Sequence, residues 1–146
     1  MARTTSDIVI GAPPSQIMDV IADFDDYPSW ATGVRVADVV SSGKDRPERV
    51  HFVLEAAPIR DQYDLGYVWD DDRSVTWHLV ERGSMLTSMD GSYELEPVGD
   101  DSTRVTYQLS VDVSIPMLGM LKRKAEKVII DTALKGLKRH VEGTRG

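Results

Sequence analysis

Residues 117–146 read MLGMLKRKAEKVIIDTALKGLKRHVEGTRG, and this stretch decides the fold. Apolar residues recur along it at near-helical spacing: Met117, Leu118, Met120, Leu121, Ala125, Val128, Ile129, Ala133 and Leu137. Pro116 suits the first helical turn, where its missing N–H costs no hydrogen bond, and Gly143 suits a left-handed C-cap. A helix of about 25 residues would extend roughly 38 Å, enough to cross a small domain. The sequence therefore predicts one long amphipathic helix at the end of the chain.

Positive charge is concentrated in this predicted helix. The segment 117–146 has eight basic and three acidic residues, a local charge of +5, whereas the other 116 residues have a charge of −12 and the whole chain −7. The basic face has two interpretations. It is either a solvated surface with local ion pairs, or a docking surface for an acyl carrier protein or an anionic membrane.

The first thirty residues predict one strand and two short helices. Residues 5–10 form a strand candidate, which Gly11-Ala12-Pro13-Pro14 ends. Apolar residues then follow at i, i+3, i+4 and i+7, as on one face of a short helix: Ile17, Val20, Ile21 and Phe24. Tyr27 precedes a proline, so we expect a bend there and one further helical turn ending near Trp30.

From Gly33 to Ser114 the sequence is typical of strands separated by short turns. Turn-forming residues cluster at 41–47, 57–58, 70–73, 83–84 and 97–101. Together with the first strand this gives about seven strands, and such short connections favour antiparallel pairing. The clearest alternation of apolar and polar residues runs over 103–114. The predicted fold is therefore α+β, with a seven-stranded antiparallel sheet wrapped around the C-terminal helix.

Length and composition exclude several classes of protein. A chain of 146 residues suits a single domain, here residues 1–146. The net charge of −7 and the absence of a nucleic-acid-binding motif argue against nucleic-acid partners. No apolar run approaches the roughly 20 residues that span a bilayer, and the N-terminus lacks a signal-peptide core, so we expect a cytoplasmic protein. The absence of cysteine excludes disulfides and thiolate chemistry.

The sequence contains no established catalytic or metal-binding motif. His51, His78 and His140 fall on separate predicted elements, and no HExxH, P-loop, GxGxxG or GxSxG motif occurs. We therefore expect neither a metal nor a cofactor. Glu55 shares strand parity with His51, and both are expected to face water. Glu81 shares parity with Trp77, which makes Glu81 a weak acid–base candidate facing the interior.

Aromatic residues dominate the inward-facing strand positions. They are either ordinary core or the wall of a ligand cavity, because tyrosine and tryptophan combine a large apolar surface with one polar group. The candidate ligand-binding residues are Trp30, Phe52, Leu54, Tyr63, Tyr67, Trp77, Met89, Tyr93, Tyr107, Met120, Ala125 and Val128.

Three further segments carry a resemblance to a known family. They are Tyr27-Pro28-Ser29-Trp30, Asp90-Gly91-Ser92-Tyr93-Glu94-Leu95, and Pro116-Met117-Leu118-Gly119 before the basic helix. With residues 10–24, they make the chain resemble the START-like, Bet v 1-like (SRPBCC) superfamily, particularly bacterial polyketide cyclase/dehydrase and coenzyme-Q-binding START-type proteins. The resemblance covers nearly the whole chain and implies a helix-grip fold with a cavity for a hydrophobic ligand, while fold alone leaves the reaction open.

Three functions follow from this resemblance. The leading one is binding, transport or presentation of a hydrophobic small molecule such as a lipid, isoprenoid quinone or polyketide. The alternative is a polyketide aromatase/cyclase acting on a carrier-bound poly-β-ketone, with Tyr63, Tyr107 and Glu81 as weak catalytic candidates. A ribosome-associating role, found among similar folds, is disfavoured by the acidic charge. Because no acid–base constellation is evident, the sequence favours binding over catalysis.

Overall fold

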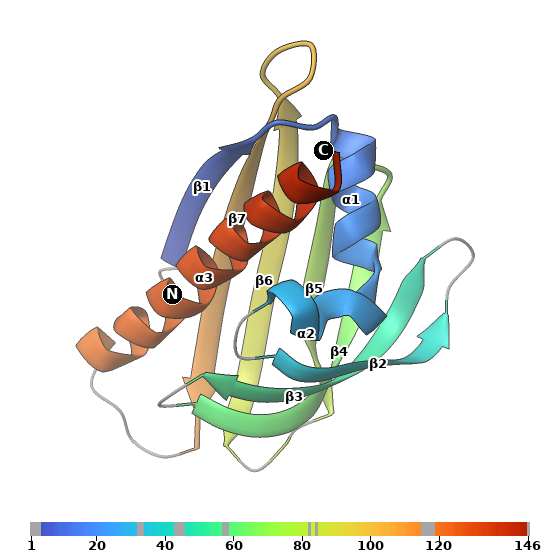
Figure 1. Cartoon of the computed structure of the whole chain (residues 1–146). Helices are drawn as coiled ribbons and strands as arrows, with labels where there is room; N and C mark the ends of the chain where they lie inside the picture. The colour runs from blue at the N-terminus through green and yellow to red at the C-terminus, as the bar shows by residue number, and fades with distance from the viewer. Residues whose placement is uncertain are drawn as a thin grey trace.

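The computed structural model describes residues 4–31, 34–42, 46–56, 59–81, 83, 85–114 and 119–145. A curved sheet holds one long helix against its concave side (Figure 1). In chain order the elements are β1 (Thr4–Ile10), α1 (Pro14–Ala22), the 3-10 turn η1 (Phe24–Asp26), α2 (Tyr27–Trp30), β2 (Val34–Ser42), β3 (Pro47–Ala56), β4 (Ile59–Asp70), β5 (Ser74–Glu81), β6 (Leu86–Pro97), β7 (Thr103–Val113) and α3 (Gly119–Arg145).

The sheet has seven strands in the order β1-β7-β6-β5-β4-β3-β2, and all its pairings are antiparallel. Strands β2 to β7 form a meander, while β1 pairs with β7 in a register that places Ile8 opposite Val105. The alternation predicted for 103–114 is confirmed, because Val105, Leu109 and Val111 are fully buried and Arg104 is exposed. The predicted α+β helix-grip architecture, with two short helices after the first strand, is confirmed.

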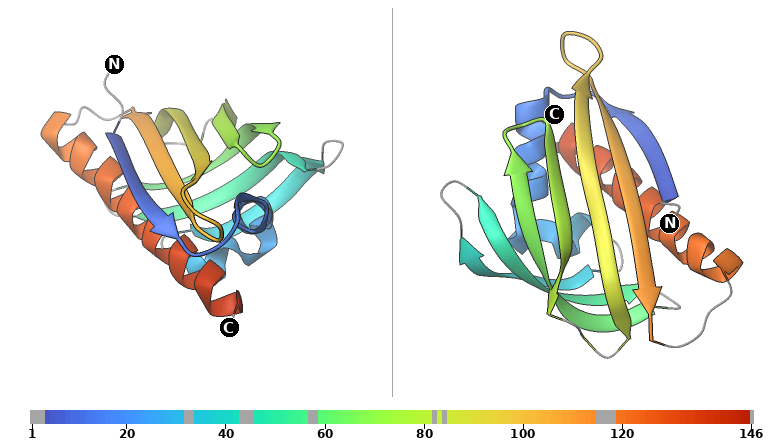
Figure 2. Two further views of the ribbon diagram at one scale, coloured as in Figure 1. Left: turned by 90° about the horizontal axis from the view of Figure 1, so that it is seen from above. Right: turned by 180° about the vertical axis from the view of Figure 1, so that it is seen from behind.

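Helix α3 crosses the concave side of the sheet (Figure 2) and buries one stripe of its surface. The stripe comprises Ala125, Ile130, Leu134, Leu137 and Val141. The predicted C-cap at Gly143 is wrong, because α3 continues to Arg145. The backbone φ of Gly143 lies outside the left-handed region that such a cap requires. The predicted position of Pro116 lies outside the described residues.

A buried carboxylate fixes α3 to the edge of the sheet. The Glu126 side chain, 1% exposed, accepts hydrogen bonds from the Thr4 hydroxyl (2.6 Å) and the Val111 backbone N–H (2.8 Å). In the described register Thr4 lies opposite Leu109, two residues before Val111 on β7. Glu126 therefore joins α3 to both β1 and β7 and supplies the acceptor for the Val111 backbone N–H.

Helices α1 and α2 lie across the opening of the curved sheet beside the C-terminal half of α3 (Figure 1). Phe24 and Tyr27 are buried, and the Tyr27 hydroxyl donates a hydrogen bond to the Ile21 carbonyl. The Asp26 carboxylate lies 2.9 Å from His140 Nε2 of α3. These contacts hold η1 and α2 as a cover over the interior.

Candidate functional site

A cavity of about 70 Å³ lies between the sheet, α2 and α3. Its wall is composed of Tyr27, Trp30, Ala31, Val34, Phe52, Leu54, Tyr63, Leu65, Tyr67, Trp77, Met89, Tyr93, Tyr107, Ile129 and Ala133. No lining residue is charged. The polar groups of this wall are tyrosine hydroxyls and one indole N–H from each tryptophan, set in an apolar surface.

Strand alternation brings the aromatic rings together. Side chains of one parity from β3 to β7 face the interior, and ring contacts connect neighbouring strands. Phe52 on β3 stacks on Tyr63 on β4 with centroids 5.9 Å apart. Trp77 on β5 lies 5.5 Å from the Tyr107 ring on β7. The wall is therefore a continuous aromatic layer across five strands.

The cavity contains every tyrosine of the chain: Tyr27, Tyr63, Tyr67, Tyr93 and Tyr107. Burial raises the pKa of each well above its ordinary value near 10, and neighbouring phenols add to the rise for all except Tyr107. These hydroxyls stay protonated at neutral pH. They suit hydrogen bonding to a ligand, whereas efficient acid–base catalysis requires a pKa near the working pH.

The volume limits what the cavity holds in this conformation. An apolar cavity of roughly 150 Å³ accommodates benzene, and small-molecule sites are usually several hundred Å³. At about 70 Å³, the interior is smaller than one aromatic ring. A ligand of that size or larger requires the lining side chains, or the cover formed by η1 and α2, to move outward.

Nine of the twelve candidate ligand-binding residues line this cavity: Trp30, Phe52, Leu54, Tyr63, Tyr67, Trp77, Met89, Tyr93 and Tyr107. Ala125 is buried but lies outside the lining. Placing Met120 and Val128 in the cavity was wrong, since they are 79% and 47% exposed. Met120 lies in the first turn of α3, which extends past the sheet (Figure 1). Val128 is two positions, about 200° of helical rotation, from the buried Ile130.

The expected interior position of Glu81 was also wrong. Its side chain is 69% exposed and lies 3.0 Å from Arg49 Nη2. The pairing of β4 with β5 shifts register between Asp64, opposite Glu81, and Leu65, opposite Leu79. A bulge of this kind changes the alternation, so Glu81 does not share a face with Trp77.

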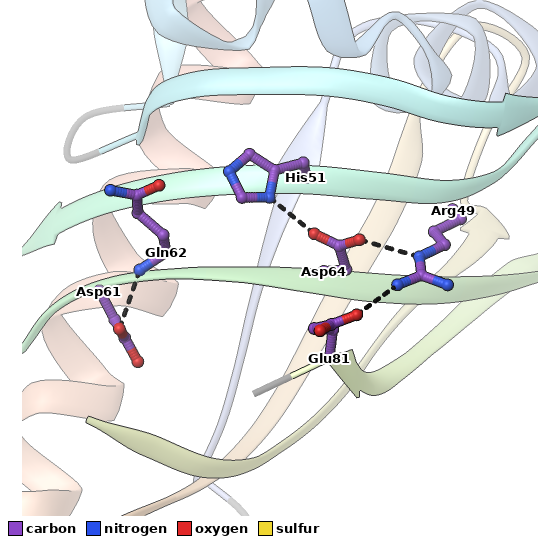
Figure 3. A network of polar contacts seen from close by, with 6 residues as sticks. All are labelled: Arg49, His51, Asp61, Gln62, Asp64 and Glu81. Carbon is purple, nitrogen blue, oxygen red and sulfur yellow. Dashed lines mark hydrogen bonds and ion pairs between the residues drawn. The ribbon is translucent and has the colours of Figure 1, made fainter. Parts of the chain in front are cut away.

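Glu81 belongs instead to a polar network on the outside of the sheet (Figure 3). The Asp64 carboxylate accepts a hydrogen bond from Arg49 Nε at 2.9 Å and lies 2.6 Å from His51 Nδ1. Partial burial acts to raise the pKa of Asp64, but the His51 and Arg49 contacts outweigh it and lower that pKa. The outward orientation predicted for His51 and Glu55 is confirmed, with side chains 35% and 37% exposed.

Six lining residues were not predicted from the sequence: Tyr27, Ala31, Val34, Leu65, Ile129 and Ala133. Leu65 could have been identified, because it shares strand parity with Tyr63 and Tyr67. Ile129 and Ala133 are one turn apart on the predicted apolar stripe. Tyr27 had no such signal, because its segment was expected to bend.

A larger depression, about 340 Å³, opens on the sheet beside the ends of β3 and β4. Asp61 in its wall is 8% exposed and accepts hydrogen bonds from the backbone N–H groups of Gln62, Met85 and Leu86. This carboxylate therefore joins β4 to the start of β6.

Metal sites and membrane spans are both absent from the described part of the chain. No group of three or more histidine, aspartate or glutamate side chains there is placed to hold a metal ion. Its helices include none with the length and apolar character needed to cross a bilayer.

Solved structures share this fold at low sequence identity. A START superfamily protein from Mycobacterium smegmatis superposes with a TM-score of 0.89 at 20% identity, covering 97% of this chain and 98% of the other. A protein from Thermus thermophilus gives 0.83 at 23%, covering 99% and 100%. The Zhui aromatase/cyclase from Streptomyces sp. R1128 gives 0.81 at 12%, covering 97% and 93%.

Sequence comparison assigns the family. No curated protein sequence matches the chain significantly. The family model described as polyketide cyclase/dehydrase and lipid transport matches residues 1–142, nearly the entire chain. The chain therefore belongs to the polyketide cyclase/dehydrase and lipid transport family.

Proposed function

We propose that this protein binds a hydrophobic small molecule, such as a lipid, isoprenoid quinone or polyketide, inside the aromatic cavity. The observation that carries the proposal is the wall itself. Side chains from six strands, α2 and α3 converge on one interior space without a charged lining residue. Such a surface favours apolar molecules with a few hydrogen-bonding groups. The family description, which joins cyclases with lipid transport, supports the same ligand class.

Native mass spectrometry of the protein purified from its own host, followed by lipid extraction, tests the proposal. We expect a retained hydrophobic ligand. Ala133→Phe, which adds a ring to the cavity wall, should abolish retention, whereas Val128→Phe on the exposed side of the same helix should not. A ligand retained equally by both variants would exclude this cavity. Recovery of only ligand-free protein, together with a crystal structure showing a filled interior, would exclude the function.

A second candidate function is cyclisation of a poly-β-ketone. The observation that favours it is the fold shared with the Zhui aromatase/cyclase and with the BexL di-domain aromatase/cyclase, of which this chain covers 47%. Because the pKa values of Tyr63 and Tyr107 are raised, these residues would orient carbonyl groups rather than transfer protons. With an offered poly-β-ketone, Tyr63→Phe and Tyr107→Phe should slow cyclisation and Glu81→Gln should leave it unchanged. Equal turnover in all variants would remove both tyrosines from the reaction.

The exposed face of α3 is a candidate docking surface through which a ligand would be delivered. Lys122, Lys127 and Lys138 form ion pairs with Asp112, Asp131 and Glu142 respectively. Among the described residues of α3, four exposed cations form no ion pair: Arg123, Lys124, Lys135 and Arg139. The exposed apolar side chains of Met120 and Val128 lie four residues to either side of Lys124.

We propose that this face docks on an anionic membrane surface. Cations attract anionic headgroups, and the apolar Met120 and Val128 side chains can enter the interface between them. The other 116 residues have a net charge of −12, which an anionic surface repels, so the attraction is concentrated on this face of α3. A membrane is favoured over an acyl carrier protein because the exposed face of α3 combines positive charge with exposed apolar side chains.

Co-sedimentation with phosphatidylglycerol vesicles tests the docking. Binding should exceed that to phosphatidylcholine vesicles and fall as salt screens the charges. Arg123→Glu with Lys124→Glu should abolish it. The matched control, Arg60→Glu with Arg73→Glu, makes the same change in net charge at side chains 74% and 76% exposed elsewhere and should retain binding. Salt-sensitive binding to an acyl carrier protein without vesicle binding would overturn membrane docking.

A further inference from the structure

The indole N–H of Trp30 is the one buried side-chain donor or acceptor without a hydrogen-bond partner among the described residues. Trp30 ends α2, is 6% exposed and lines the cavity. Buried tryptophan N–H groups usually have a partner, because an unpaired buried donor has lost its water without compensation. The unpaired donor therefore needs an explanation.

Packing holds the Trp30 side chain in place. Its ring centroid lies 4.8 Å from that of Tyr27, and its indole stacks on the His140 ring at 6.3 Å with an interplanar angle of 22°. Its backbone carbonyl is pressed against Gly136 of α3. These contacts on both sides fix the ring in the cavity wall rather than leaving it free to find a partner elsewhere.

Trp69 provides an internal comparison. Its indole N–H donates a 2.6 Å hydrogen bond to the Pro47 carbonyl, and its ring lies outside the cavity lining. The indole N–H of Trp69, which connects two neighbouring strands, therefore has a hydrogen-bond partner within the protein. At the cavity wall, by contrast, the donor of Trp30 has no protein acceptor among the residues that the structure describes.

We propose that Trp30 Nε1 donates a hydrogen bond to an acceptor oxygen of the bound ligand. This inference rests on the proposed cavity function and narrows its ligand class to uncharged molecules bearing a carbonyl, such as a ketone or quinone. An N–H group donates only, so its partner must be an acceptor. The lining residues include no cation to compensate a carboxylate, so a fatty-acid anion would lose its hydration without an ion pair. Trp30 therefore selects for a neutral acceptor and positions it beside α2.

Three probes of similar shape separate the effect of the acceptor oxygen from the effect of a negative charge on the ligand. 2-Acetylnaphthalene carries a ketone, 2-isopropenylnaphthalene replaces the ketone oxygen by CH₂, and 2-naphthoate replaces the ketone by a carboxylate. Calorimetry on the whole chain should show the ketone binding about three- to tenfold more tightly than the alkene, the range that one neutral hydrogen bond supplies. The naphthoate should bind most weakly. Trp30→Phe should abolish the preference for the ketone, and the matched control Trp69→Phe should keep it.

The wild-type protein provides a readout that does not depend on a variant folding. In a ¹H–¹⁵N spectrum, the Trp30 indole proton should shift downfield with the ketone and stay near its ligand-free position with the alkene. Equal affinities for the two probes and an unmoved indole signal would overturn the role of Trp30 while leaving cavity binding intact. Failure of all three probes to bind would overturn the cavity proposal and this inference together.

Discussion

The backbone carbonyl oxygen of Trp30 lies well inside van der Waals contact of the position that a Cβ would occupy at Gly136. Real Cβ atoms do not approach a backbone oxygen this closely, so only glycine permits α3 and α2 to pack as they do. Gly136 is itself buried in α3. His140, four residues further along the same helix, stacks on the Trp30 ring. The contact joins the long helix to the cover of the cavity.

Gly136→Ala should destabilise the protein by about 1–3 kcal/mol, the usual cost of forcing an extra methyl group into a packed interior. The displaced α2 should also weaken binding of 2-acetylnaphthalene. The control is Gly143→Ala in the same helix, where nothing lies within 4 Å of the new Cβ. That variant should gain up to about 1 kcal/mol, because alanine favours helix over glycine. Urea unfolding monitored by circular dichroism measures both. Equal stabilities of the two variants would contradict the close contact.

Glu126→Gln should lower the free energy of unfolding by about 1–3 kcal/mol. The carboxylate accepts one hydrogen bond on each oxygen, from Thr4 and from Val111, whereas the glutamine amide offers only one acceptor oxygen. Asp131→Asn, which removes an exposed ion pair with Lys127, should cost only about 0.3–0.5 kcal/mol. Denaturant unfolding at neutral pH distinguishes them. A Glu126→Gln protein as stable as the Asp131→Asn protein would exclude the anchoring role of this carboxylate.

Ionisation of the tyrosines should occur only as the protein unfolds. In the unfolded chain they titrate near pH 10, while burial raises the pKa of all five in the native state. Above pH 10 the unfolded state therefore binds fewer protons than the native state, and stability falls as pH rises. The tyrosinate absorbance at 295 nm should appear in one cooperative step that coincides with loss of circular dichroism. A gradual rise near pH 10 in still-folded protein would show that the phenols are accessible to water.

Asp64→Asn should destabilise the folded protein mainly at neutral pH. The Arg49 and His51 contacts lower the pKa of Asp64 below its unfolded value, so the carboxylate contributes stability above the unfolded pKa, near 4. That contribution is lost as pH falls through the lowered native pKa. We expect the substitution to lower the free energy of unfolding by about 1 kcal/mol at pH 7 and by less at pH 3.

The control for this comparison is Asp70→Asn. Asp70 forms an exposed pair with Arg73, with side chains 57% and 76% exposed, and should change stability little at either pH. Thermal unfolding of both variants at the two pH values measures the difference. A loss for Asp64→Asn that is the same at pH 3 and pH 7 would show that its effect is not electrostatic.

The misplaced residues show where strand and helix patterns fail. Alternation located Tyr63 and Tyr107 because β4 and β7 are regular at those positions. It failed for Glu81, since the register shift in the β4–β5 pair depends on contacts between two strands. Val128 was misplaced because several apolar positions lie around α3, and only the sheet determines which of them become buried.

The sequence by itself determined the architecture. Turn residues at short intervals specify consecutive antiparallel strands, and a long apolar stripe at the C-terminus specifies the helix that they surround. Local chemistry suffices for these features, because backbone hydrogen bonding and burial of one face follow from patterns a few residues long. Only the tertiary structure decided the size of the cavity, the place of Tyr27 in its wall and the unpaired N–H of Trp30. Those features depend on how η1 and α2 pack against Gly136 and His140. Because these residues lie more than a hundred positions later in the chain, no local sequence pattern predicts the contact.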